Sequence, residues 1–313
     1  MMRIVNQLET KLNYRPQIDD FYEQPSIQGL HEAYQALHGQ QTENNKVETP
    51  ELGQHTDAAC LEQIDFIADP TERAAFKAQR HGIRRLQEPG IPLTASTISD
   101  TQYDQLRSHR YYSADEIPLH DLSQLLAPLR QQNPTTPKYL YGSAGGLYPV
   151  QTYIYIKPGR VERLAGGIYY YHPIQHQLVL ITDVELDERI YNPHINRPIY
   201  QRAAFALFMV AELAAIAPLY QEHALQFSTI EAGLMTQLLR IQAPTIKLGI
   251  CEIGELDFKP VRPLFALAET QELIYSMVGG IPEEHPETED TAYYQGMFNE
   301  QGKEHMEREE EEF

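Results

Sequence analysis

Cysteine is scarce in this chain: only Cys60 and Cys251 occur among its 313 residues. Two cysteines cannot form a disulfide framework, and these two lack the close spacing of a metal-binding pair. Disulfide-stapled scaffolds and cysteine-ligated zinc sites are therefore excluded. Thiols that stay reduced favour a cytoplasmic protein.

Long uninterrupted apolar runs are missing as well. The most apolar stretch, residues 203–219, contains Glu212 and ends near Pro218, so it does not predict a membrane span. The first residues, "MMRIVNQLETKLNYRP", have no apolar core followed by a small-residue cleavage site, so they do not predict a secretory signal. Both absences favour a cytoplasmic location without a membrane partner.

Basic residues are few: 25 Lys and Arg stand against 44 Asp and Glu, which gives a net charge of −19. No basic track with interleaved aromatic residues is visible, which argues against nucleic acid as a partner. The acid excess is concentrated in residues 281–313, where twelve acidic residues accompany two basic ones. Because like charges repel, we expect a solvated, disordered tail over residues 283–313, with a docking role or an expression artefact as alternatives.

Apolar residues make up 42% of the chain, enough for a large core, and three regions are expected. Residues 1–95 are predicted to form a helical N-terminal extension with a linker, and residues 96–282 the main domain, which the acidic tail follows. The extension is expected to hold one helix in "IQGLHEAYQALHG" and another in "DPTERAAFKAQRHGIRRL". In the second helix, Asp69 would be the cap, Pro70 the first helical residue and Gly82 an interruption.

The main domain alternates between helix and strand patterns. A helix is expected from about Pro118 to before Pro134, and a half-buried strand in "VQTYIYIKP", where apolar residues alternate with polar and aromatic ones. The segments "GGIYYYHP" and "HQLVLITD" would pair as a hairpin, and "LGICEIG" would form a short strand. The pattern predicts an α+β fold around a mostly antiparallel sheet.

Two further helices are predicted in this domain. Residues 203–219 are apolar nearly all round, which is typical of a helix buried inside a domain or at a subunit interface and so suggests a dimer. The segment "STIEAGLMTQLLRIQAP" is predicted to be a helix that is broken by Pro244. Its apolar stripe consists of Ile230, Leu234, Leu238 and Ile241.

Three polar features have an ordinary structural interpretation. Ser228 and Glu231 form an S-x-x-E pattern that predicts a helix cap, with an acid role for Glu231 as the alternative. His172 and His176 lie around a turn, where a four-residue spacing does not suit a metal, so we expect both to be solvated. No metal site is predicted.

The segment "KYLYGSAGGLYPV", residues 138–150, places small residues between tyrosines. Consecutive small residues either make a tight turn before the strand or let backbone amides approach a flat or anionic ligand. Upstream, "LRSHRYYS" holds Arg107 and Arg110 around Ser108, so two guanidinium groups and a hydroxyl could converge on one phosphate. The alternative for this second segment is an exposed basic turn.

These segments resemble a known family. The stretch "LRSHRYYSADEIPLHDLSQLL" resembles the opening of the nitroreductase-like flavoprotein fold. "KYLYGSAGGLYPVQTYIYI" is similar to the dehydrogenases that oxidise thiazolines and oxazolines to azoles in peptide natural products, including oxidase domains of nonribosomal peptide synthetases. Further similarity follows in the family's order, over about residues 70–282. The resemblance implies a nitroreductase-like FMN fold, dimeric, built on a mostly antiparallel sheet with flanking helices.

The resemblance also implies roles for individual residues. Lys138 and Tyr139 match the family's catalytic pair, whose ordinary alternative is a solvated cation beside a packed ring. The "YQEH" segment at residues 220–223 departs from the family, which puts in doubt any contact made there. The residues implied to bind FMN are Arg107, Ser108 and Arg110 at the phosphate and ribityl chain, Ser143, Ala144, Gly145 and Gly146 along the isoalloxazine ring, and Gly249, Cys251, Ile253 and Gly254 over the flavin.

The implied activity is that of an FMN-dependent oxidase that converts thiazoline or oxazoline to thiazole or oxazole, with O2 reoxidising the flavin to give H2O2. Tyrosine has an ordinary pKa of about 10, so we expect the Lys138 ammonium to favour the Tyr139 phenolate as the base. The expected substrate is a peptide intermediate tethered to a carrier domain of a nonribosomal peptide synthetase module. The alternatives are an azoline dehydrogenase of ribosomally made peptides and a catalytically silent flavin-fold module.

Overall fold

The computed structural model describes residues 67, 69–83, 91, 93–94, 104–132, 138–193 and 195–283. The chain divides into two units, Met1–Phe66 and Ile67–Phe313, and all described residues belong to the second. The first predicted helix and most of the acidic tail lie outside the described residues. None of the helices in the described part of the chain has the length and hydropathy of a membrane span.

The predicted second helix is confirmed as α5, Pro70–Gln79. Asp69 is its N-cap, and the Asp69 carboxylate accepts a hydrogen bond from the backbone N–H of Glu72 at 2.9 Å. The helix ends at Arg80, whose φ of 48° lies in the left-handed region. It therefore stops two residues before Gly82, the interruption that the sequence predicted.

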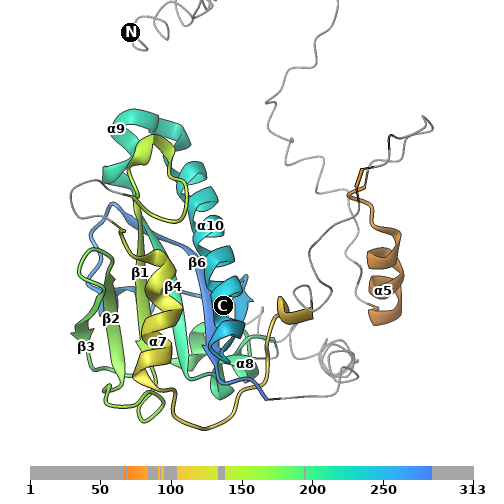
Figure 1. Cartoon of the computed structure of the whole chain (residues 1–313), viewed down its shortest axis with the longest axis horizontal. Helices are drawn as coiled ribbons and strands as arrows, with labels where there is room; N and C mark the ends of the chain where they lie inside the picture. Colours follow the sequence, from red (N-terminus) through yellow and green to blue (C-terminus); the bar gives the residue numbers. More distant parts are fainter. Residues whose placement is uncertain are drawn as a thin grey trace, which may run out of the picture. The chain divides into compact units, whose positions relative to one another are not determined.

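The main domain contains one six-stranded sheet in which every neighbouring pair is antiparallel (Figure 1). The spatial order is β3-β2-β1-β4-β6-β5, and β2 and β3 form the predicted hairpin. This confirms the predicted α+β fold with an antiparallel sheet. The strands are β1 Val150–Ile156, β2 Gly167–His172, β3 Gln177–Thr182, β4 Phe205–Glu212, β5 Gly249–Ile253 and β6 Gln271–Gly280.

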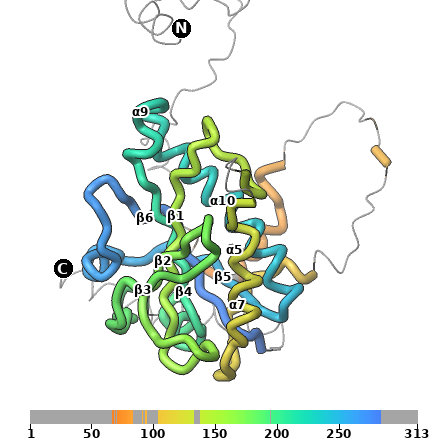
Figure 2. The backbone as a smooth tube through the Cα atoms, turned by 60° about the vertical axis from the view of Figure 1, so that its left-hand side comes forward, coloured from red at the N-terminus to blue at the C-terminus, as the bar shows by residue number. Residues whose placement is uncertain are grey.

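Helices cover both faces of this sheet. On one face lie α7, Leu119–Leu126, continued by a 3-10 turn to Leu129, and the long α10, Ala224–Thr245 (Figures 1 and 2). The other face is covered by α8, Arg197–Arg202, and by the loops and 3-10 turns between the strands. A short helix, α9, Ala217–Tyr220, precedes α10. The predicted helix after Pro118 is thus confirmed.

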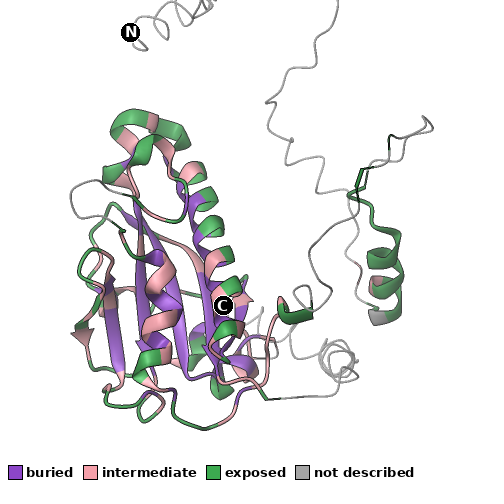
Figure 3. Cartoon of the chain, viewed as in Figure 1, coloured by how far each residue is buried: buried purple, intermediate pink, exposed green. Residues whose placement is uncertain are grey.

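The prediction of a buried helix over residues 203–219 is wrong, because its first half is β4. This strand lies between β1 and β6, and each residue from Phe205 to Val210 is fully buried (Figure 3). A central strand with both faces covered is apolar at every position, so periodicity cannot distinguish it from a buried helix. The dimer that was inferred from this burial loses that support.

Strand β1 is also more buried than expected. Its alternation predicted one solvated face. Tyr153 and Tyr155 are nevertheless buried beneath the layer that contains α8, and only Gln151 is half-buried. Aromatic rings on the outer face provide enough apolar surface to support that second layer. The sheet is therefore the middle of a three-layer domain.

Helix α10 is confirmed, but a different face of it is buried. Ile230, Leu234 and Ile241 of the predicted stripe are 56%, 44% and 51% exposed. The face packed on the sheet and α7 carries Ala232, Met235 and Leu239 instead. We call the three exposed residues the α10 ridge. Pro244 lies in the last turn, one residue before the helix ends.

Candidate functional site

Tyrosine side chains gather where the segment before β1 meets the hairpin. The Tyr139 and Tyr148 rings lie 4.1 Å apart between centroids, and Tyr141 packs against both, at 5.2 and 5.7 Å. Tyr170 and Tyr171, consecutive residues of β2, also border this space. Together with Glu212, Met235 and neighbouring residues, these tyrosines line a cavity of about 210 Å³.

The small residues beside this cavity form a tight turn, one of the two interpretations that the sequence left open. The turn contains a 3-10 segment, Ala144–Gly146, with φ values of 61° at Gly145 and 67° at Gly146. A Cβ atom at Gly146 would meet no atom within 4 Å, so the backbone there is open. An open backbone lets a flat ligand approach closely.

Gly145 is constrained by a neighbouring ring. A Cβ atom at this position would lie 2.9 Å from the hydroxyl oxygen of Tyr220, at the end of α9. Tyr220 also packs edge-on against Phe227 of α10, with centroids 5.1 Å apart. Residues 220–223, which depart from the family's sequence, therefore contact the small-residue turn through the Tyr220 ring.

The helix-cap prediction for Ser228 and Glu231 is wrong, because α10 begins four residues before Ser228. The Ser228 hydroxyl donates to the carbonyl of Ala224 at 2.8 Å, one turn back along the helix. Glu231 points inward, is 2% exposed, and accepts a hydrogen bond from the backbone N–H of Val150 at 3.2 Å. It is also hydrogen-bonded to the side chain of Ser143, and burial raises the pKa of its carboxyl to about 7.

Tyr139 is a half-buried residue of the cavity, and Lys138 beside it is exposed. The Tyr139 hydroxyl lies 3.4 Å from the side-chain oxygen of Gln131. Burial raises the pKa of Tyr139, and the nearby Tyr170, Tyr148 and Glu231 raise it further. We expected Lys138 to lower this pKa; the direction in the structure is the opposite.

His176 does not match the prediction of a solvated turn residue. Its Nδ1 atom is hydrogen-bonded to the Tyr171 hydroxyl at 2.8 Å, and its Nε2 atom to the Ser123 hydroxyl at 3.0 Å. Burial lowers the pKa of His176. His172 is the last residue of β2, is half-buried, and accepts a hydrogen bond from the Gln175 backbone. Among the described residues, no group of three potential ligands is arranged to hold a metal.

The segment with Arg107 and Ser108 lies against β5 and the end of α10. The Ser108 hydroxyl donates to the Glu252 carboxylate at 3.2 Å, and the same carboxylate forms a 3.1 Å ion pair with Arg240. Arg240 also donates to the carbonyl of Leu106 at 2.9 Å. Neither Arg240 nor Glu252 is predicted from the sequence, because their pairing joins α10 to β5 across the fold.

The residues predicted to cover the flavin from β5 differ in their surroundings. A Cβ atom at Gly249 would lie 2.6 Å from the His109 ring, so this glycine is needed for close packing of the Arg107 segment. The side chains of Cys251 and Ile253 are buried in the core on the α8 side of the sheet. Gly254 is exposed. On the side of the sheet where Arg107 lies, β5 presents the Glu252 side chain instead.

The two predicted parts of the ligand site lie at different heights on α10. Ser143 is attached at Glu231, whereas Leu106 is attached at Arg240. At 1.5 Å per residue, these two positions are about 14 Å apart along the helix axis. Guanidinium groups near one end and an open small-residue turn near the other suit an extended ligand with an anionic group and a flat ring.

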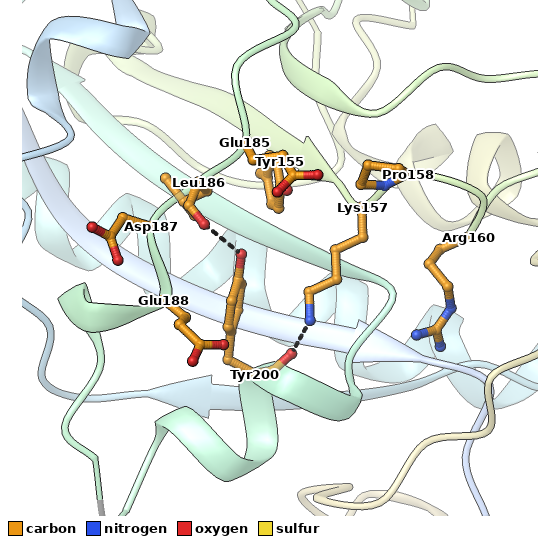
Figure 4. A pocket seen from close by; sticks show the side chains of 9 residues that line it. All are labelled: Tyr155, Lys157, Pro158, Arg160, Glu185, Leu186, Asp187, Glu188 and Tyr200. Carbon is orange, nitrogen blue, oxygen red and sulfur yellow. Dashed lines mark hydrogen bonds between the residues drawn. The ribbon is translucent and has the colours of Figure 1, made fainter.

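A larger cavity of about 600 Å³ lies where β1 ends, on the other face of the sheet (Figure 4). There the Lys157 ammonium donates to the carbonyls of Tyr200 and Gln201 at 2.5 and 3.0 Å and lies 4.1 Å from the centre of the Tyr200 ring. Burial lowers the pKa of Lys157 to about 8. These carbonyls end α8, so Lys157 closes that helix and has a structural role.

Comparisons with known proteins agree with this architecture. The Nitroreductase family model matches residues 104–281, more than half of the chain. The indigoidine synthase of Dickeya dadantii (strain 3937) is 30% identical over 127 residues, which are 40% of this chain and 8% of that protein. The indigoidine synthase of Streptomyces lavendulae is 27% identical over 186 residues, 58% of this chain and 13% of that protein. The chain thus spans a small part of these curated relatives.

Among solved structures, a chain of the E. coli microcin synthetase McbBCD complex has the same fold, with a TM-score of 0.55 and 17% sequence identity. The alignment covers 72% of this chain and 87% of that one. The family match includes the whole sheet, the tyrosine cavity and the Arg107 segment. We conclude that the chain belongs to the nitroreductase family.

Proposed function

We propose that the protein is an FMN-dependent oxidase that converts a thiazoline or oxazoline to the corresponding azole in a peptide natural product. The observation that carries this proposal is the position of Tyr139, in a cavity that adjoins the open turn at Gly146. A proton-transfer group beside a surface that accepts a flat ring is what this oxidation requires.

FMN would be held by both parts of the site. Arg107, Ser108 and Arg110 would bind the phosphate and ribityl chain, and the ring would lie along Ser143, Ala144, Gly145 and Gly146. Near the phosphate end, the positive charge of Arg240 offsets the negative charge of the Glu252 carboxylate. When bound, FMN supplies the two-electron oxidising capacity, with O2 as the final acceptor and H2O2 as its product.

Tyr139 would accept the proton that leaves the azoline carbon. Because burial raises the pKa of Tyr139, its phenolate form becomes more populated only as the pH increases above neutrality. Lys138 is exposed at the same edge, from which its ammonium could approach the phenolate once substrate is bound. The reaction is therefore expected to be faster in alkaline solution.

A homodimer is part of this proposal, and the α10 ridge supports it. Ile230, Leu234 and Ile241 form an uncovered apolar line between the two parts of the site. A twofold axis across α10 would cover the ridges of both copies. It would also bring the Arg107 end of one copy toward the Gly145 end of the other, so two copies could share each site.

The proposed partner is a nonribosomal peptide synthetase module that presents the azoline on its carrier domain. The similarity to two indigoidine synthases supports a place in natural-product assembly. An azoline dehydrogenase for ribosomally made peptides is the alternative within the same chemistry. A catalytically silent flavin-fold module is the alternative without chemistry.

The test is to load the purified protein with FMN and to offer a thiazolinyl peptide both free and attached to a carrier domain. The expected result is a product two mass units lighter, with stoichiometric H2O2. Turnover of the carrier-bound form alone would support the synthetase partner, and turnover of a free peptide would support the alternative. FMN binding without any turnover would favour the silent module, and absence of FMN binding would overturn the proposal.

A further inference from the structure

Glu231 is a buried carboxyl group to which the proposed reaction assigns no role. It projects from the inner face of α10, and 2% of its surface is exposed. Isolated carboxyl groups are costly to bury, so a buried one is expected to have specific partners. Its partners are the backbone N–H of Val150 and the side chain of Ser143.

These two partners stand at opposite ends of the small-residue turn. Ser143 precedes Gly145 and Gly146, and Val150 is the first residue of β1. One carboxyl group of α10 thus holds both ends of the loop that carries the open backbone. A substitution at Glu231 would release both ends together.

The turn needs such support because its backbone is strained. Besides the two glycines, Tyr148 has a φ of 51°, which is in the left-handed region and is unfavourable for a residue with a side chain. The backbone N–H of Tyr148 donates to the Ser143 hydroxyl oxygen at 2.8 Å. Ser143 therefore links the Tyr148 backbone to the Glu231 carboxyl.

This chain of contacts ends at the proposed base. The Tyr148 ring lies 4.1 Å from the Tyr139 ring, between centroids, so the orientation of Tyr148 determines the packing surface of Tyr139. Glu231 also acts on Tyr139 through its charge, since the carboxylate raises the pKa of Tyr139 and of Tyr141. Among the described residues, these two phenols, both on the segment before β1, are the titratable groups whose pKa the Glu231 charge raises.

We propose that Glu231 is the positioning residue of this site, whose carboxylate holds the Ser143–Val150 turn in the conformation that accepts the flavin ring and keeps Tyr148 packed on Tyr139. This inference rests on the proposed function for its flavin part. Glu231 contacts neither substrate nor cofactor in this role, and it acts through Ser143 and the Val150 backbone.

The first test needs no flavin. Amide hydrogen exchange is measured at Tyr148 and Val150 in the full chain, in Glu231→Gln and in Glu231→Ala. Glutamine keeps one acceptor oxygen but, like the protonated carboxyl, has a donor in place of the other, so a modest increase in exchange is expected, whereas alanine should speed exchange at both amides by about ten-fold, as for the loss of one hydrogen bond. Unchanged exchange in Glu231→Ala would overturn the positioning role.

The second test follows FMN affinity by quenching of flavin fluorescence between pH 6 and pH 8. In the parent, protonation of Glu231 adds a donor where Ser143 and Val150 need an acceptor, so affinity should weaken as the pH falls through about 7. Glu231→Gln cannot titrate and should lack this step. The FMN phosphate itself titrates near pH 6 and affects both proteins alike. The quantity to compare at each pH is therefore the dissociation constant of the parent divided by that of Glu231→Gln. This ratio is expected to change about five-fold between pH 6 and pH 8.

A matched control removes an equal charge elsewhere. Glu162 is exposed in the turn after β1, and Glu162→Gln should reproduce the parent at every pH. A constant ratio of parent to Glu231→Gln affinity would overturn the flavin part of the inference. If the parent binds no FMN, the proposed function fails, and the exchange experiment alone then decides whether Glu231 positions the turn.

Discussion

The carboxyl group of Glu231 accepts a hydrogen bond from the backbone N–H of Val150, 3.2 Å away, and so ties the middle of α10 to the start of β1. Because the same carboxyl is hydrogen-bonded to Ser143, the loop between Ser143 and Val150 is closed against the helix. The loop holds the small residues and borders the tyrosine cavity. The helix therefore controls the geometry of the candidate site.

The buried Glu231 should make stability depend on pH. Its carboxyl has a pKa of about 7 in the folded chain and an ordinary value of 4.5. The folded state thus holds this proton more tightly, so the stability contributed by the protonated form is present below pH 4.5 and is lost as the pH increases to 7. The loss amounts to about 3 kcal/mol.

Urea unfolding of the parent and of Glu231→Gln at pH 5 and pH 8 measures this effect. The free energy of unfolding of Glu231→Gln minus that of the parent should increase from pH 5 to pH 8. Equal pH dependence in both proteins would show that Glu231 titrates normally.

Replacement of Gly145 by alanine should destabilise the turn more than the same change at Gly146. Both residues have positive φ, which costs alanine about 1 kcal/mol at either position. At Gly145 the new methyl group would also lie 2.9 Å from the Tyr220 hydroxyl. Thermal unfolding and FMN affinity are the measurements, and Tyr220→Phe in the Gly145→Ala background should recover part of the loss. Equal effects at the two glycines would contradict the contact with Tyr220.

Tyr139→Phe should leave FMN binding intact and reduce the turnover of an azoline by about 10² or more, the contribution typical of a general base. In the parent, kcat should increase with pH above neutrality, because burial raises the pKa of this phenol. Glu231→Gln removes a charge that raises that pKa, so its profile should move to lower pH. A Tyr139→Phe enzyme with parental kcat would remove Tyr139 from the mechanism.

Loss of Arg240 should be more harmful than loss of its partner. The Arg240 and Glu252 side chains are 28% and 18% exposed, and their ion pair joins α10 to β5. Arg240→Gln leaves a carboxylate without its cation and should lower the free energy of unfolding by on the order of 2 kcal/mol. Glu252→Gln leaves a guanidinium that still donates to Leu106, so its effect should be smaller. Chemical denaturation of both variants measures the two losses in free energy of unfolding. A larger loss in Glu252→Gln than in Arg240→Gln would refute the prediction.

A charged residue on the α10 ridge should separate the proposed dimer. Ile230 is 56% exposed, and Ile230→Glu would place a carboxylate within the proposed interface. Analytical ultracentrifugation should show a monomer that binds FMN weakly. Ile174 in the hairpin turn is 53% exposed, so Ile174→Glu is a matched control that should leave the mass unchanged. A monomeric parent would contradict the dimer.

Local patterns determined much of this fold from the sequence. The hairpin of β2 and β3, the Asp69 cap of α5 and the tight turn at Gly145 depend on residues close together in the chain. Turn chemistry and capping act over a few residues, so the sequence was enough to predict them. The small-residue segment and the Arg107 segment could likewise be recognised from the sequence.

Tertiary structure decided the features that depend on what packs against each element. Residues 205–212 are a strand because two layers cover both faces of it, which an apolar run alone does not distinguish from a helix. Glu231 lies inside, and the α10 ridge outside, because the position of the sheet determines which side of α10 is buried. The sequence therefore determined the pieces of the candidate site, while packing of α10 on the sheet decided their geometry, since contacts between residues distant in the chain exist only once the layers meet.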